Sequence, residues 1–155
     1  MDEIKQTLLR QLHRADPDLR ARATHQLWHL WYSAAGPQFE QRLMEAERLL
    51  ENGQADQAED ALTEVIRQAP NFAEGWNRRA TFRYMRQQIA ESLADCLEVV
   101  RLEPHHFGAW HGMGLCYMAT HQYIEAAAAF RRALEIQPFA EANQQLLAEC
   151  LGKLN

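Results

Sequence analysis

The chain has 155 residues, a net charge of −5 and a hydrophobic fraction of 47%. This length is enough for one domain with a real core, and the composition is ordinary for a folded protein, so disorder over most of the chain is excluded. The acidic balance lacks the basic footprint that nucleic-acid binding requires, and no run of about 18 apolar residues predicts a membrane-spanning helix, so we expect neither nucleic acid nor membrane insertion.

The cysteines and the first residues bear on the compartment. Cys96, Cys116 and Cys150 are odd in number and far apart, which argues against a disulfide framework or a zinc ribbon and favours reduced thiols. The chain starts with a charged stretch that has no apolar run of signal-peptide length. We therefore expect a cytoplasmic protein.

Two helices are predicted in an N-terminal segment, residues 1–38. The first, over 2–14, follows from apolar residues at helical spacing. The second begins at Asp16-Pro17, because aspartate is a favourable N-cap and proline fits the first helical turn. It runs to about Ser33, where a Gly-Pro pair soon follows.

This second helix carries Trp28 and Trp31, a large apolar load for four residues. One interpretation is that the segment packs on the rest of the fold and buries both tryptophans against a helix predicted at 39–52. The alternative is that the segment makes a dimer contact or lies in a groove of the molecule, because interfaces also use aromatic clusters.

A period of 34 residues runs through the remainder of the chain. Pro70, Pro104 and Pro138 keep this spacing, and so do Trp76 and Trp110. Three further sets repeat at the same interval: Ala58, Ser92 and Ala126; Leu62, Cys96 and Phe130; Val65, Val99 and Ala133. Small residues let helices approach closely, large ones fill the gaps, and the prolines end helices. A fixed period of this length indicates stacked helix pairs.

On these residues the chain resembles the tetratricopeptide repeat family. The third repeat matches best, with Trp110-x-x-Met113-Gly114-x-x-Tyr117 followed by Ala126-x-x-x-Phe130. The departures elsewhere are Arg79 and Arg83, where the second repeat usually has Leu and Tyr, and Arg42 and Glu45, where the first usually has Trp and Leu.

The resemblance implies an all-α, right-handed α-solenoid of antiparallel helix pairs. We expect three repeats over 39–138, at about 39–72, 73–106 and 107–140. Their helices are predicted at about 39–52, 55–68, 73–86, 89–102, 107–119 and 123–136. Gly53 marks the turn within the first pair, where the later repeats have Gln87 and His121.

Residues 139–155 are expected to form a capping helix. Its stretch Glu141–Leu151 is amphipathic, as a solubilising end cap should be. The packing face is predicted to hold Ala142, Leu146, Leu147 and Cys150, and the outer face Glu141, Asn143, Gln144 and Glu149.

For function, the resemblance implies a non-enzymatic scaffold or adapter that binds a protein or peptide partner in a concave groove lined by the first helix of each pair. Asn77, Thr81 and Tyr84 fall on one helix face. Amide and guanidinium groups can hold a peptide backbone or a carboxylate, while Tyr and Met give apolar contact. The candidate groove residues are Asn77, Arg78, Thr81, Tyr84, Met85, His111, Leu115 and Met118.

One tetratricopeptide subtype binds the C-terminal carboxylate of chaperone peptides through Lys, Asn and Arg side chains. That subtype uses five such positions, and none of them matches here. In this chain the five positions hold Leu43, Glu47, Arg78, Gly108 and Gly112. That clamp is therefore not expected. The strings Asn71–Thr81 and Pro104–Ala109 also resemble a group of bacterial tetratricopeptide proteins, which supports a bacterial adapter and implies no mechanism.

Two other functions compete with the adapter. The first is a structural homo-oligomer that self-associates through Trp28 and Trp31. The second is a metal-dependent sensor or enzyme that uses the histidines, but His25 and His29 lack a third ligand at suitable spacing, and His105 and His106 are interpreted as exposed turn residues. We expect no metal, no cofactor and no catalytic residue.

Overall fold

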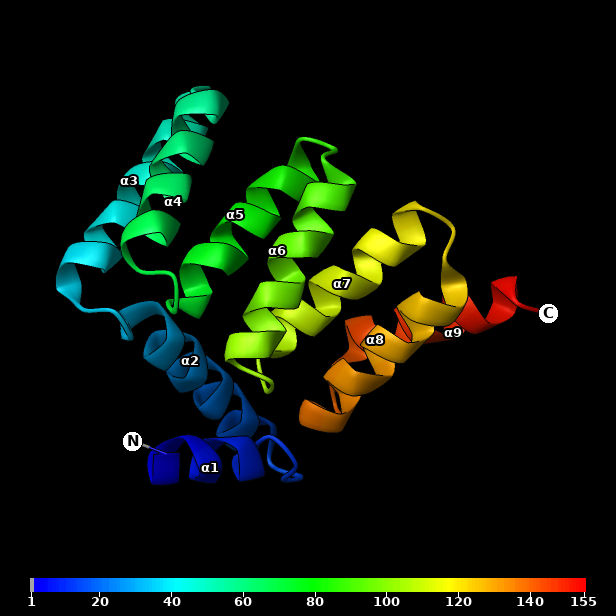
Figure 1. Ribbon diagram of the computed structural model, residues 1–155. Coiled ribbons are helices and arrows are strands. Elements are labelled where there is room, and N and C mark those ends of the chain that lie inside the picture. Colours follow the sequence, from blue (N-terminus) through cyan, green and yellow to red (C-terminus); the bar gives the residue numbers. More distant parts are fainter. Residues whose placement is uncertain (1) are drawn as a thin grey trace.

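The computed structural model describes residues 2–155, which form nine α-helices and no strand. The helices are α1 (Asp2–Gln11), α2 (Pro17–Ser33), α3 (Pro37–Glu51), α4 (Ala55–Gln68), α5 (Ala73–Met85), α6 (Ile89–Leu102), α7 (Phe107–Ala119), α8 (Tyr123–Ile136) and α9 (Glu141–Lys153). Figure 1 shows the pairs α3–α4, α5–α6 and α7–α8 stacked in chain order, with α9 at the end farthest from α3. The expected all-α solenoid of antiparallel helix pairs is confirmed.

The helix following each of the three spaced prolines is tied to that proline in the same way. The indole nitrogens of Trp76 and Trp110 donate to the carbonyl oxygens of Pro70 and Pro104, at 2.9 and 2.8 Å. Gln144, a further 34 residues along, donates from Nε2 to the carbonyl of Pro138 at 2.9 Å. The capping helix α9 therefore starts as the first helix of another repeat would, with an amide in place of the indole.

The capping helix buries one residue that was predicted to face outward. Asn143 is 5% exposed, and its Oδ1 lies 2.6 Å from Nδ1 of His111 on α7. Ala142, which was expected on the packing face, is exposed, whereas Cys150 is buried as expected. The amphipathic pattern predicted that Asn143 faces solvent, because a sequence pattern does not reveal a hydrogen-bond partner on another helix.

Close packing between α7 and α8 depends on one glycine. A Cβ built on Gly114 would overlap the ring of Phe130, which is fully buried. Ser92 similarly lies against α5, with Oγ donating to the carbonyl of Ala80 at 2.7 Å. Small residues at the periodic positions therefore allow the close helix contacts that the sequence predicts.

The first repeat is atypical because no repeat precedes it. Arg42 and Glu45, at positions where the family has Trp and Leu, are both exposed on α3. Leu43 and Ala46, by contrast, are fully buried against the rest of the first pair. Polar residues at the two positions keep the outer surface of α3 solvated.

The N-terminal helices pack on the third repeat, and this corrects one expectation. Trp28 and Trp31 do not pack against α3; their rings lie 5.4 and 5.0 Å from the ring of Phe107, at the start of α7. Trp31 is 5% exposed and shares a core with Leu27 and Ile136. In Figure 1, α1 and α2 lie across one edge of the stack, so a segment at one end of the chain reaches the far repeat.

Helix α1 is shorter than the predicted 2–14. It ends at Gln11, and the guanidinium of Arg20 then donates to the carbonyls of Arg14 and Ala15, both at 2.8 Å. Asp16 caps α2 by accepting from the amide of Asp18 at 2.9 Å. These contacts stabilise the chain reversal and end α1 early.

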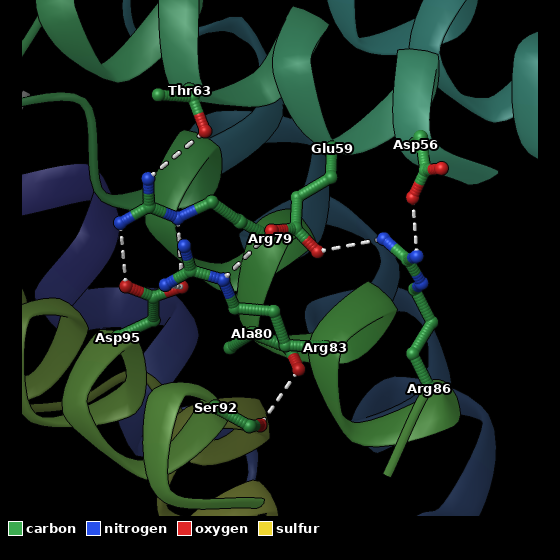
Figure 2. Close-up of polar contacts among 9 residues, drawn as sticks. All are labelled: Asp56, Glu59, Thr63, Arg79, Ala80, Arg83, Arg86, Ser92 and Asp95. Carbon is green, nitrogen blue, oxygen red and sulfur yellow. Dashed lines mark hydrogen bonds and ion pairs between the residues drawn. The ribbon is translucent and has the colours of Figure 1, made fainter. Parts of the chain in front are cut away.

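Charged residues meet between α5 and α6, within the second repeat (Figure 2). Arg79 makes a two-point contact with Asp95, at 2.9 and 2.8 Å, and Arg83 donates to the same carboxylate at 3.0 Å. Asp95 is 2% exposed. The two arginines that depart from the family pattern are therefore matched by one buried acid on α6.

The same network continues onto α4. Arg79 donates to Thr63 at 3.1 Å, and Arg86 bonds Glu59 at 3.1 Å and also Asp56 (Figure 2). Asp56, Glu59 and Thr63 share one face of α4, so three helices from two repeats are joined by ion pairs.

No helix among the described residues combines the length and the apolar character that crossing a membrane needs.

Candidate functional site

A cavity of about 180 Å³ lies between α5 and α7. We call it the groove cavity. It brings together five of the eight candidate groove residues: Asn77, Thr81, Tyr84, His111 and Leu115. Small-molecule pockets have volumes of roughly 300–1,000 Å³, so this cavity suits a single side chain better than a whole ligand.

The depth of the groove cavity comes from residues without large side chains. Ala80, Ser92 and Cys96 border it and are buried, and Gly108 and Gly112 leave space on α7. A Cβ on Gly112 would lie 3.2 Å from Sγ of Cys96. A hydrogen bond with Cys116, together with burial, raises the pKa of the Cys96 thiol, so this wall of the cavity is neutral.

Arg78 lies outside the cavity lining and is held by its neighbours. Its guanidinium pairs with Glu74 at 3.0 Å and with Glu47 at 2.6 Å, and it lies 5.2 Å from the ring of Tyr32 on α2. Asn77 also donates to Glu74, at 3.0 Å. Arg78 therefore links the first repeat, the second repeat and the N-terminal segment.

The two candidate methionines differ from each other. Met85 is 62% exposed at the end of α5, and Met118 is half-buried and packs against the core formed by α8 and α9. Neither lines the groove cavity. Met85 is available for a surface contact, whereas Met118 contributes mainly to the fold.

A buried acid–histidine pair was missed by the sequence interpretation. His106 was expected to be an exposed turn residue, but His106 and Glu74 are both fully buried, and Nε2 of His106 lies 3.0 Å from Oε2 of Glu74. Nδ1 of His106 accepts from the amide of Ala109 at 3.1 Å, which caps α7. Because Nδ1 accepts, Nε2 carries the proton and donates it to the carboxylate.

The surroundings of Glu74 keep it ionised. Burial by itself raises the pKa of this carboxyl, but the hydrogen bond from His106, the charge of Arg78 and the bond from Asn77 outweigh it, so the pKa is lowered overall. Trp31 stacks on the His106 ring, with centroids 4.3 Å apart.

The residue 34 positions before His106 is Phe72, which is also buried. That periodicity was the sequence signal that could have predicted the burial of His106.

The N-terminal segment packs against Gly108, a residue that lines the groove cavity. A Cβ on Gly108 would lie 2.5 Å from Cη2 of Trp28, so this tryptophan sits directly on the first turn of α7. Trp28 also meets the His106 ring edge-on at 5.1 Å.

The metal candidates are not brought together. His25 and His29 are both exposed on α2, and His106 is committed to Glu74 and Ala109. Residues 2–155 contain no group of three or more His, Cys, Asp and Glu side chains placed to hold a metal ion.

Taken together, the fold defines an all-α repeat solenoid, a class whose extended surfaces bind other proteins. Tetratricopeptide repeat models match residues 43–105 and 107–140. A TPR repeat-containing protein of Rhizobium etli is 30% identical over 149 residues, which cover 94% of this chain and 73% of that protein. The chain belongs to the tetratricopeptide repeat family.

Solved structures agree on the fold. The first TPR of Spaghetti (RPAP3), bound to an HSP90 peptide, has a TM-score of 0.70 and 21% identity, covering 73% of this chain and 90% of that one. The Sgt2 TPR domain from Aspergillus fumigatus has a TM-score of 0.70 and 19% identity, covering 76% and 80%. At these identities the likeness concerns the fold alone.

Proposed function

We propose that this protein is a non-enzymatic adapter that binds a peptide segment of a partner protein along α5 and α7, with one apolar side chain of the peptide inserted in the groove cavity. The observation that carries the proposal is the cavity itself. It opens between the first helices of two repeats and is bordered by Thr81, Tyr84 and Leu115. Tyr84 supplies aromatic contact and a hydroxyl, and Leu115 supplies apolar contact.

The groove chemistry favours an uncharged anchor. Gly108 and Gly112, Leu43 and Glu47 stand at four of the positions where chaperone-binding relatives use basic or amide side chains, and Arg78, at the fifth, is paired with Glu74 and Glu47. The HSP90 peptide bound by the first TPR of Spaghetti (RPAP3) is therefore a poor guide to this partner. We propose a peptide whose anchor is an apolar side chain.

The test starts with a displayed peptide library selected on the immobilised protein. Selected peptides are titrated against wild type, Tyr84→Ala and Gly112→Ala. Alanine favours a helix over glycine by about 1 kcal/mol, so Gly112→Ala should stay folded while its Cβ narrows the cavity. We expect wild-type dissociation constants of about 1–100 µM and losses of about tenfold, or roughly 1.4 kcal/mol, in each variant.

A matched control uses Met44→Ala, because Met44 is exposed on α3 and does not line the groove cavity. Its affinity should equal that of wild type. Unchanged affinity in both cavity variants, or an equal loss in Met44→Ala, would contradict the proposal.

Other parts of the interpretation stay proposals. We propose the division into an N-terminal segment (1–38), three repeats (39–138) and a capping helix (139–155), and a reducing, cytoplasmic compartment in keeping with three buried free cysteines. Self-association through Trp28 and Trp31 is the alternative function. The burial of Trp31 inside the protomer weighs against it.

A further inference from the structure

A second cavity, of about 430 Å³, is formed where the N-terminal segment meets the third repeat. We call it the α1–α8 pocket. Leu9 and Arg10 come from α1, His105 from the turn before α7, and Arg132 and Ile136 from α8. In Figure 1 the end of α1 lies close to the end of α8, so segments from opposite ends of the chain build this pocket. Its volume falls within the roughly 300–1,000 Å³ of small-molecule sites.

The charges of this pocket oppose those of the whole molecule. The chain carries a net charge of −5, yet the pocket is lined by two arginines against one acid, Glu135, with His13 and His105 beside them. Arg132 donates from one Nη to Glu135 at 2.5 Å, and its guanidinium lies 5.8 Å from the ring of Trp110. These two contacts orient the guanidinium of Arg132. Arg10 is exposed and donates to Thr7 at 3.1 Å. With five donors on each guanidinium, both arginines keep free N–H groups.

Apolar surface lies beside these charges. Leu9 is half-buried and Ile136 is 4% exposed, and both line the pocket. A ligand that fills the space therefore needs an apolar body as well as a negative group. The two arginines against one glutamate match a single negative charge, as on a carboxylate, better than the nearly doubly charged phosphate monoester.

We propose that the α1–α8 pocket binds a small organic carboxylate with an aliphatic body, held by Arg10 and Arg132 and packed on Leu9 and Ile136. The site shares no lining residue with the groove cavity, so it stands independently of the adapter proposal. It also exists only while the N-terminal helices are docked, because Leu9 and Arg10 belong to α1.

The experiment is a nuclear magnetic resonance titration of the full chain with hexanoate. Acetate carries the charge without the aliphatic body, hexan-1-ol carries the body without the charge, and inorganic phosphate is a second anion. We expect hexanoate to shift the signals of Arg10, His105, Arg132 and Ile136, with a dissociation constant on the order of 1 mM for so small a ligand. Each of the other three probes should bind at least about tenfold more weakly.

Variants separate this site from general surface charge. Arg10→Gln and Arg132→Gln should each weaken hexanoate binding by about threefold or more, and Glu135→Gln should strengthen it by a similar factor. Arg131→Gln is the matched control, because Arg131 neighbours Arg132 but is exposed and lies outside the pocket. Thermal melting of each variant confirms that it is folded.

Three results would overturn the proposal: no localised shifts with hexanoate, equal binding of any of the other three probes, or an equal loss in Arg131→Gln. Because Arg10 is exposed, Arg10→Gln remains informative even if Arg132→Gln loses stability with its Glu135 contact. A negative result here leaves the groove cavity untouched, since its test uses other residues.

Discussion

The turns within the helix pairs each require one residue with a positive φ, which limits the residue types that fit there without strain. Gly53, Gln87 and His121 occupy equivalent turns with φ values of 77°, 62° and 60°. Glycine adopts this left-handed region without steric cost, whereas other residues lose roughly 1–2 kcal/mol there. The 34-residue period aligns Gln87 and His121 with Gly53, so the sequence placed all three residues at equivalent turns.

We predict that Gln87→Gly stabilises the protein. Gln87 is exposed, so the substitution removes strain without removing a buried contact, and the free energy of unfolding should rise by about 0.5–1 kcal/mol. Gly53→Ala, the reciprocal change, should lower it by a similar amount. Urea unfolding measures both, and a Gln87→Gly variant less stable than wild type would show that strain at this turn is not significant.

Single residues were misplaced where their partners lie on another helix. His106 and Asn143 were both interpreted as solvent-facing, yet each is buried and bonded to a residue 32 positions away. Polarity is a reliable guide to exposure only when no partner compensates the loss of water. The partners, Glu74 and His111, could not be identified without the tertiary arrangement.

Between elements, the network of Arg79, Arg83 and Asp95 replaces the apolar contact typical of the family. Two guanidiniums share one carboxylate that is 3% exposed at its side chain. Removing one member of a buried ion pair leaves an uncompensated charge, which costs more than the pair itself contributes. The network therefore restricts which substitutions are compatible with one another.

We predict that Asp95→Ala lowers the free energy of unfolding by about 3–5 kcal/mol, because Arg79 loses its carboxylate partner and Arg83 keeps only Glu59, at 3.5 Å. The triple variant Arg79→Leu, Arg83→Tyr, Asp95→Ala should recover most of this loss, since it restores apolar packing between the repeats. Chemical denaturation of both variants provides the comparison. If the triple variant is as unstable as Asp95→Ala, then the ion pairs themselves stabilise this interface, and the loss in Asp95→Ala does not come from arginines left without a partner.

At the scale of the whole molecule, the N-terminal segment packs where the second repeat meets the third and forms one wall of the α1–α8 pocket. Trp28 and Trp31 contact His106 and Phe107, and Lys5 pairs with Glu103 at 3.0 Å. Both groups of contacts lie where the second repeat meets the third. Docking of α1 and α2 therefore completes the α1–α8 pocket.

We predict that Gly108→Ala loosens this docking. Its Cβ would overlap the Trp28 ring, so the ring must move, at a cost of about 1–3 kcal/mol offset by about 1 kcal/mol of improved helix propensity. Hydrogen exchange should accelerate in α1 and α2 while α8 stays protected. Gly152→Ala, where an added Cβ meets nothing within 4 Å, is the control and should leave exchange in α1 and α2 unchanged. Unchanged exchange in Gly108→Ala would show that Trp28 adjusts without loosening the docking.

The sequence by itself determined the solenoid, its repeat period and the limits of most repeat helices. The prolines, the glycine turn and the sets of residues that repeat every 34 positions are local signals that recur, and each recurrence supports the others. The predicted limits of 55–68 and 89–102 are those observed for α4 and α6, and α3 begins only two residues before the prediction. Five candidate groove residues also line one cavity, and three of them come from one face of α5, as their helical spacing predicted; that they bind a partner stays a prediction.

Only the tertiary structure decided where the N-terminal segment packs, which polar residues are buried and that Arg78 is held by Glu74 and Glu47. These features depend on contacts between residues far apart in the chain, such as Trp28 on Gly108 or Leu9 beside Ile136. The segment lies outside the repeat, so no period constrains it, and its apolar face could be buried equally well on several surfaces. Shape and charge complementarity with the third repeat select one of them, and that selection creates the α1–α8 pocket.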